Sequence, residues 1–142
     1  MSTDDLKSIT RAFYAAIDAD QAQSIPPMLA TQVVVRLPGA PPLDRTAFQQ
    51  FGQGFYAAFP DLQHTIEEQV AEGNTVVTRL VARGTHRGEF QGIPPTGRAV
   101  TVAAISVQRY RDGQIVEQDL ILDALGLMQQ LGAIPAPAPA PA

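Results

Sequence analysis

The stretch from Phe59 to Gly97 constrains the fold of this chain more than any other part of it. Two segments in which apolar and polar residues alternate meet at the turn Glu72-Gly73-Asn74, and the second runs into a loop rich in glycine and proline. A further pair of such segments turns at Asp112-Gly113. Alternation with a period of two is typical of half-buried strands, and Asp-Gly is a favoured hairpin turn. The sequence therefore predicts a curved antiparallel sheet with strands over roughly 64–71, 75–86, 99–111 and 114–122.

Helices are predicted before this sheet. A capping box at Ser2 to Asp5 and apolar residues at helical spacing predict a first helix that ends near Ala19. Residues 20–30 are expected to form a short helix broken at Pro26-Pro27, followed by a strand over 31–37. Another helix should start at Asp44 or Thr46 and end at Pro60. Four phenylalanines are predicted to form an aromatic stripe along that helix: Phe48, Phe51, Phe55 and Phe59. A short last helix is predicted over 124–131.

Helices followed by mostly antiparallel strands indicate an α+β fold. With 142 residues, 45% of them hydrophobic, the chain is expected to form one domain over residues 1–133. The alternating proline and alanine residues over 134–142 are expected to form a disordered, extended tail.

The composition argues against several classes of function. A net charge of −4 and a single lysine argue against a nucleic-acid partner. The chain has no cysteine, and its two histidines, His64 and His86, lack the spacing of metal ligands, so no metal site is expected. No apolar run is long enough for a membrane span, and the acidic N-terminus does not resemble a signal peptide. We expect a cytoplasmic protein with no membrane partner.

The order of these elements resembles that of the SnoaL-like polyketide cyclases, a branch of the nuclear-transport-factor-2-like superfamily. The resemblance extends from Leu6 to Gly132 and is most specific in four motifs: FPD at 59–61, GTHRGEFQGIPPTG at 84–97, DGQIVE at 112–117 and LDALGLMQQLG at 122–132. It implies a cone-shaped α+β barrel in which the curved sheet wraps around the N-terminal helices and encloses a pocket for an apolar small molecule. It also implies a homodimer, which the apolar outer face of the predicted sheet favours as well.

The same resemblance places the familiar catalytic positions of this superfamily on residues that cannot perform the chemistry. The cyclases' active-site histidine falls on Ser106 and their aspartate on Leu120, where epoxide hydrolases of this fold also place a carboxylate. Three functions therefore stay open. The first is a cyclase or isomerase that needs no cofactor and moves a proton on an apolar carbonyl compound. The others are a non-catalytic ligand-binding or dimerisation module and an epoxide hydrolase-like enzyme.

Asp119 is the first catalytic candidate, because burial in its apolar neighbourhood would raise its pKa towards that of a general base. The alternative is an ion pair on the outer face of the sheet, since alternation points Asp119 away from Leu120. Gln108 would orient a ligand and Tyr14 would donate a hydrogen bond to it. His64 is expected to be exposed or to cap a turn, and His86 to hold the rim loop together. The predicted substrate-binding residues are Val35, Phe55, Ser106, Leu120, Leu122 and Ile93.

Overall fold

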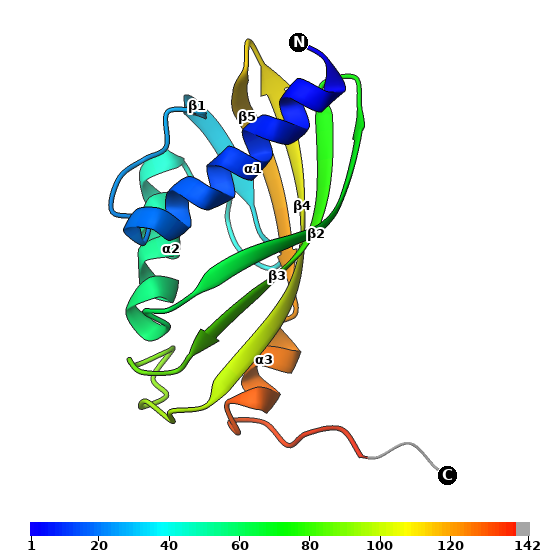
Figure 1. The fold of residues 1–142 in the computed structure, drawn as a ribbon. Coiled ribbons are helices and arrows are strands. Elements are labelled where there is room, and N and C mark those ends of the chain that lie inside the picture. Colours follow the sequence, from blue (N-terminus) through cyan, green and yellow to red (C-terminus); the bar gives the residue numbers. More distant parts are fainter. Residues whose placement is uncertain (139–142) are drawn as a thin grey trace.

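The structure is a computed structural model that describes residues 1–138. These residues form an α+β domain, as the order of the sequence patterns predicts (Figure 1). The elements are α1 (Thr3–Asp20), β1 (Leu29–Arg36), α2 (Arg45–Ala58), β2 (Gln63–Glu72), β3 (Thr75–Thr85), β4 (Ala99–Arg111), β5 (Gln114–Leu122) and α3 (Ala124–Gln130). The end of the predicted tail, residues 139–142, lies outside the described residues. Within the described part of the chain, no helix is long and apolar enough to cross a membrane.

The five strands form one curved sheet in the order β1-β5-β4-β3-β2. The pairs β2–β3, β3–β4 and β4–β5 are antiparallel, as predicted, but β1 pairs with β5 in parallel. The expectation of mostly antiparallel strands is confirmed, and the parallel pair at this edge is the exception. A parallel pair needs a long crossover, and here one helix and three strands separate β1 from β5 in the chain.

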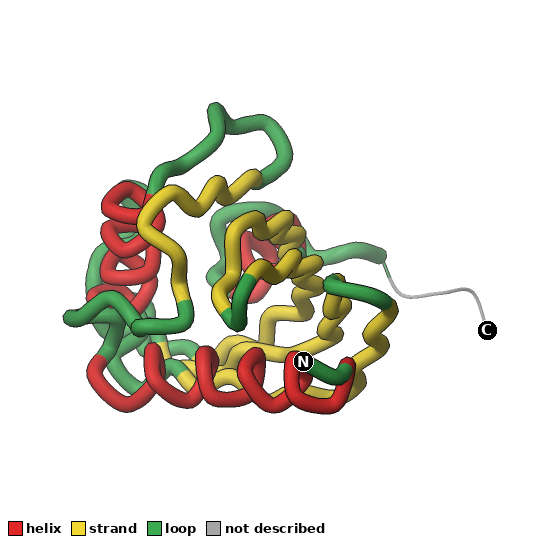
Figure 2. Tube along the Cα trace, turned by 90° about the horizontal axis from the view of Figure 1, so that it is seen from above, coloured by secondary structure: helices red, strands yellow, loops and turns green. Residues whose placement is uncertain are grey.

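The two long helices cover the concave side of the sheet. Helix α1 packs against β2 and β3, α2 packs against β1, and the short α3 packs against β4. Seen from above, α1 and α2 stand along two sides of the curled strands (Figure 2). Both helices begin where the sequence predicts, because Ser2 and Asp44 accept hydrogen bonds from the backbone of the first turn. This arrangement directs the apolar side chains of both helices into the interior of the sheet.

The helix predicted over 20–30 is absent, and residues 21–28 form turns instead. Gln21 and Ala22 both have positive φ angles, of 57° and 58°, which reverses the chain directly after α1. Pro26 and Pro27 follow, and neither has the backbone N–H that a helix requires. The reversal places this segment beside α2, where the Gln49 side chain donates to the backbone oxygens of Ala22 and Gln23.

Candidate active site

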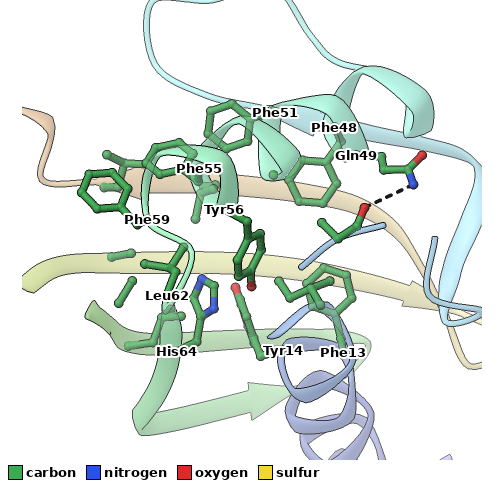
Figure 3. Close-up of a pocket in the computed structure, with 18 of the residues that line it drawn as sticks. Phe13, Tyr14, Phe48, Gln49, Phe51, Phe55, Tyr56, Phe59, Leu62 and His64 are labelled. Carbon is green, nitrogen blue, oxygen red and sulfur yellow. Dashed lines mark hydrogen bonds between the residues drawn. The ribbon is translucent and has the colours of Figure 1, made fainter. Parts of the chain in front are cut away.

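An apolar cavity of about 120 Å³ lies between α1, α2 and the concave face of the sheet. For scale, an engineered apolar cavity of about 150 Å³ holds benzene. The aromatic stripe of α2 lines one side of the cavity, with Phe13, Tyr14 and His64 across from it (Figure 3). The sheet contributes a further apolar wall: Leu80, Ala82, Val100, Val102, Ala104, Leu120 and Leu122. A cavity of this size and lining suits a small apolar ligand.

His64 is the histidine in the cavity wall, and Asp18 holds it there. The ring Nδ1 of His64 donates to Asp18 Oδ1 at 2.7 Å, and its backbone N–H donates to Asp18 Oδ2 at 2.8 Å. Tyr56, on α2, also donates to Asp18 Oδ1, at 2.5 Å. A carboxylate can only accept hydrogen bonds, so Nδ1 carries the proton and the Nε2 of neutral His64 has a free lone pair. This is the arrangement of an oriented general base.

The surroundings of Asp18 keep its carboxylate ionised. Burial alone would raise its pKa, but the hydrogen bonds from the His64 ring, the His64 backbone and the Tyr56 hydroxyl outweigh burial. The pKa of Asp18 therefore lies below its ordinary value of 3.8. Burial, followed by the hydrogen bond to Asp18, raises the pKa of Tyr56, which remains a proton donor at neutral pH.

Tyr14 lies next to this histidine, with the two ring centroids 5.3 Å apart. Burial raises the pKa of Tyr14 to about 12, and the nearby Ser106 hydroxyl offsets part of the rise. Within the described residues, neither the Tyr14 nor the Ser106 hydroxyl is aligned with a partner for a hydrogen bond. Tyr14 belongs to the cavity wall, and the Ser106 hydroxyl lies beside its own hydroxyl.

A second polar position in the wall is Gln118, on β5. Its side chain is fully buried, and its Oε1 accepts a hydrogen bond of 2.6 Å from Gln108 Nε2. The Oε1 of Gln108 accepts from the hydroxyls of Thr10, at 2.8 Å, and Tyr110, at 3.2 Å. Gln108 therefore does not contact the cavity but fixes the side chain that does.

The predicted binding residues divide into two groups. Tyr14, Phe55, Leu120 and Leu122 line the cavity. The others lie behind the wall: Val35, Ser106 and Gln108 are buried beside it, and Ile93 packs in the rim loop, where its backbone pairs with Phe90. Parity along a strand identifies the inward face, but α1 covers one end of that face, and for this reason Val35, Ser106 and Gln108 do not reach the cavity.

Asp119 does not face the cavity, which corrects its assignment as the candidate base. It lies on the outer face of the sheet, opposite Val107 on β4. Its carboxylate pairs with Arg109 at 3.0 Å and with Arg36 at 3.8 Å, while its neighbour Leu120 points inwards. Side chains alternate between the two faces of the sheet along β5, and this places Asp119 outside. The orientation favours a structural ion pair over a catalytic role for Asp119.

Sequence reasoning missed three residues of the site: Asp18, His64 and Gln118. A signal existed for each. His64 has the same parity on β2 as Ile66, and Gln118 has the same parity on β5 as Leu120 and Leu122. Asp18 follows Tyr14 by four residues, which places both on one face of α1. His86, by contrast, is fully buried in the rim loop, where its Nδ1 accepts a hydrogen bond from the Thr96 backbone.

Titratable groups are not clustered as metal ligands usually are. Among residues 1–138, no group of three or more histidine, aspartate or glutamate side chains could hold a metal ion.

Several solved structures share this fold, and some of them are described as candidate polyketide cyclases. IdmH from Streptomyces antibioticus, described as a candidate polyketide cyclase, is 34% identical, with a TM-score of 0.81 over 89% of this chain and 98% of that one. AclR from Streptomyces galilaeus, described as a candidate hydroxylase, is 26% identical, with a TM-score of 0.88 over 96% of this chain and 87% of that one. TsrD from Streptomyces laurentii shares the fold at 24% identity, with a TM-score of 0.82 over 94% of this chain and 99% of that one.

No curated protein matches the chain in sequence. The model of one protein family, the SnoaL-like polyketide cyclases, matches residues 7–131. This range includes every helix and strand apart from the first turn of α1. The resemblance noted from the motifs is thereby confirmed, and the chain belongs to the family of SnoaL-like polyketide cyclases.

Proposed function

We propose that this protein is a cyclase or isomerase that moves a proton on an apolar carbonyl compound, with His64 as the base and Tyr14 as the hydrogen-bond donor. The observation that carries the proposal is a histidine in the wall of an apolar cavity, whose Nδ1 is bonded to the half-buried Asp18 and whose Nε2 bonds to no other residue in the described part of the chain. Such a pairing both orients the ring and stabilises its charged form. The reaction uses side chains alone.

In the proposed reaction, His64 Nε2 removes a proton from the carbon next to the ligand's carbonyl group. The electron pair of the C–H bond then forms a carbon–carbon double bond, and the π electrons of the carbonyl group move to its oxygen. The ligand is thereby converted to an enolate. Tyr14, whose pKa is raised to about 12, remains protonated and donates a hydrogen bond to that oxygen. The enolate carbon then either attacks a second carbonyl carbon, which closes a ring and leaves an alkoxide that takes the proton from His64, or a different carbon of the ligand takes that proton, which gives an isomer.

Deuterium exchange tests this chemistry without knowledge of the natural substrate. An unbranched methyl ketone in D₂O, followed by NMR, should exchange the protons next to its carbonyl group faster with the protein than without it. His64→Gln removes the proton acceptor and should lower the catalysed rate by about 10² or more. Asp119→Asn, on the outer face, is the matched control and should exchange at the wild-type rate. Exchange that survives unchanged in His64→Gln would contradict the proposal.

The second candidate is a binding module without chemistry. The almost wholly apolar wall and the presence of Leu120 where the related cyclases are expected to carry an aspartate favour it. Saturable binding of the ketone to the wild type, detected by calorimetry and accompanied by no catalysed exchange, would support this alternative against the enzyme.

We also propose that the protein is a cytoplasmic homodimer that associates through the outer face of the sheet. Val77, Ile105 and Ile121 are exposed on that face, at 37%, 43% and 58%. Exposed apolar side chains that gather on one face commonly mark an interface. Arg109 and Asp119 pair beside them and would form a polar rim. Light scattering at micromolar concentration should give the mass of two chains, and the mass of one chain would refute the dimer.

A further inference from the structure

We infer that Gln118 is a specificity-determining residue that donates a hydrogen bond to a second carbonyl oxygen, far from the group that His64 and Tyr14 act on. The ligand would then be an apolar molecule that carries two acceptor oxygens. This inference rests on the ligand pocket of the proposed function, and it adds the substrate class.

The amide of Gln118 is buried, partly bonded and directed at the cavity. Only 1% of the residue is exposed, and it belongs to the cavity wall. Its Oε1 is occupied by Gln108. In the part of the chain that the structure describes, its Nε2 donates to no other residue. A ligand that brings an acceptor to this N–H gains a hydrogen bond in an otherwise apolar wall, so such an acceptor is favoured there.

A relay of hydrogen bonds determines which end of the Gln118 amide faces the ligand. Thr10 and Tyr110 approach each other at 2.6 Å, so one hydroxyl donates to the other, and both lie within hydrogen-bond distance of Gln108 Oε1. Gln108 turns its Nε2 towards Gln118, whose Oε1 accepts the hydrogen bond, and this leaves the Nε2 of Gln118 as the amide end that faces the cavity. The group presented to the cavity is thus an N–H donor, and it selects an acceptor such as a carbonyl oxygen.

The sheet register separates this donor from His64. His64 on β2 pairs with Ala82 on β3, and Ala82 pairs with Val102 on β4. Gln118 on β5 pairs with Gln108 on β4. The two positions on β4 are thus six residues apart, about 20 Å along the strand. Side-chain length and the curvature of the sheet shorten this path, and the two side chains enter the cavity wall from different strands at different heights.

The wall between the two ends offers apolar contacts. Leu80 and Ala104 on the sheet face Phe13 and Phe48 from the helices across the cavity. Phe13 and Phe48 are stacked, with ring centroids 6.5 Å apart. The part of the ligand between its two oxygens must therefore be hydrocarbon, since a polar group there would lose its hydration without gaining a partner.

A series of unbranched methyl diketones tests the inference, with the methyl monoketones of the same chain lengths as controls. Each diketone carries a carbonyl next to both ends of its chain, so each pair differs only by the second oxygen. Calorimetry should show that one diketone, whose length matches the cavity, binds the wild type about tenfold more tightly than its monoketone, as expected for one added hydrogen bond. Equal affinity within every pair would overturn the inference.

Gln118→Met removes the donor at nearly constant shape and should abolish the preference for the diketone while monoketone binding remains. Because this change also leaves Gln108 Nε2 without an acceptor, Gln118→Glu provides a second variant in which that bond is kept. At alkaline pH, where the new carboxyl group is ionised, it accepts but cannot donate, so the diketone should lose its advantage there too. A diketone preference that survives in both variants would overturn the role of Gln118.

The two proposals fail in different ways. Retention of monoketone exchange in His64→Gln contradicts the base but leaves the affinity series unaffected. Loss of the diketone preference in the wild type contradicts the role of Gln118 but leaves proton exchange intact. If no ketone binds the folded wild type, both proposals are overturned.

Discussion

Replacement of Asp18 by asparagine should destabilise the protein far more than an ordinary surface change. Asp18 accepts hydrogen bonds from the His64 ring, the His64 backbone and Tyr56. Asparagine keeps one acceptor oxygen, and its NH₂ group would meet a donor in the place of the other. A hydrogen bond to a charged group contributes about 1.5–3 kcal/mol. The loss of one such bond and the weakening of two should cost about 2–4 kcal/mol at neutral pH.

For a domain of this size, 1 kcal/mol changes Tm by about 4 °C, so Tm should fall by about 8–16 °C. Urea unfolding, followed by circular dichroism, measures the free energy directly. Asp4→Asn is the matched control, because Asp4 is exposed in the first turn of the same helix. That control loses only a helix-dipole interaction, about 0.3–1 kcal/mol.

The pH dependence of this loss has a definite sign. The pKa of Asp18 is lowered in the folded protein, so ionised Asp18 stabilises the fold at any pH above its ordinary value of 3.8. This contribution disappears as the pH falls through the lowered value. The difference between the wild type and Asp18→Asn should therefore shrink below about pH 4. A neutral-pH cost no larger than that of Asp4→Asn, or a difference that does not shrink in acid, would refute the account of this cluster.

Three further outcomes are expected. Gly88→Ala should lower the free energy of unfolding in urea by about 1–3 kcal/mol, because a Cβ at this position would overlap the Ala57 carbonyl oxygen. The control Gly54→Ala faces open space on α2 and should be neutral or stabilising. Equal effects of the two changes would contradict the described packing. Asp119→Asn should change stability by less than about 1 kcal/mol, because its ion pairs are half-exposed; a larger loss would indicate that they are buried in an interface. Deletion of residues 135–142 should leave Tm within about 1 °C, since residues 135–138 are exposed and outside any helix or strand; a fall of several degrees would show that the segment docks.

The sheet was predictable because its signals are local. Strands β4 and β5 begin and end at the predicted residues, where alternation stops at the Asp112-Gly113 turn. The turn segment after α1 was not predictable, since nothing in its sequence marks Gln21 and Ala22 as left-handed residues. The parallel pairing of β1 with β5 was also hidden, because it depends on the path of the whole chain.

The site was predictable only in part, for a related reason. Leu120 and Leu122 follow from strand parity, and Phe55 follows from the aromatic stripe of α2. The contact between Asp18 and His64 joins residues 46 positions apart and arises only when α1 packs against β2. Likewise, Gln118 shares its parity with Leu120, but its importance appears only once Gln108 is seen to fix it.

The most direct test of the account is the protonation pattern of His64, read from ¹⁵N NMR of the histidine side chains with and without a bound methyl ketone. The account predicts that neutral His64 carries its proton on Nδ1, bonded to Asp18, and that the ketone changes the Nε2 signal while the Nδ1 signal keeps its place. In Asp18→Asn the preference for this tautomer should weaken. A proton on Nε2 in the wild type, or a bound ketone that leaves Nε2 unchanged, would contradict the account.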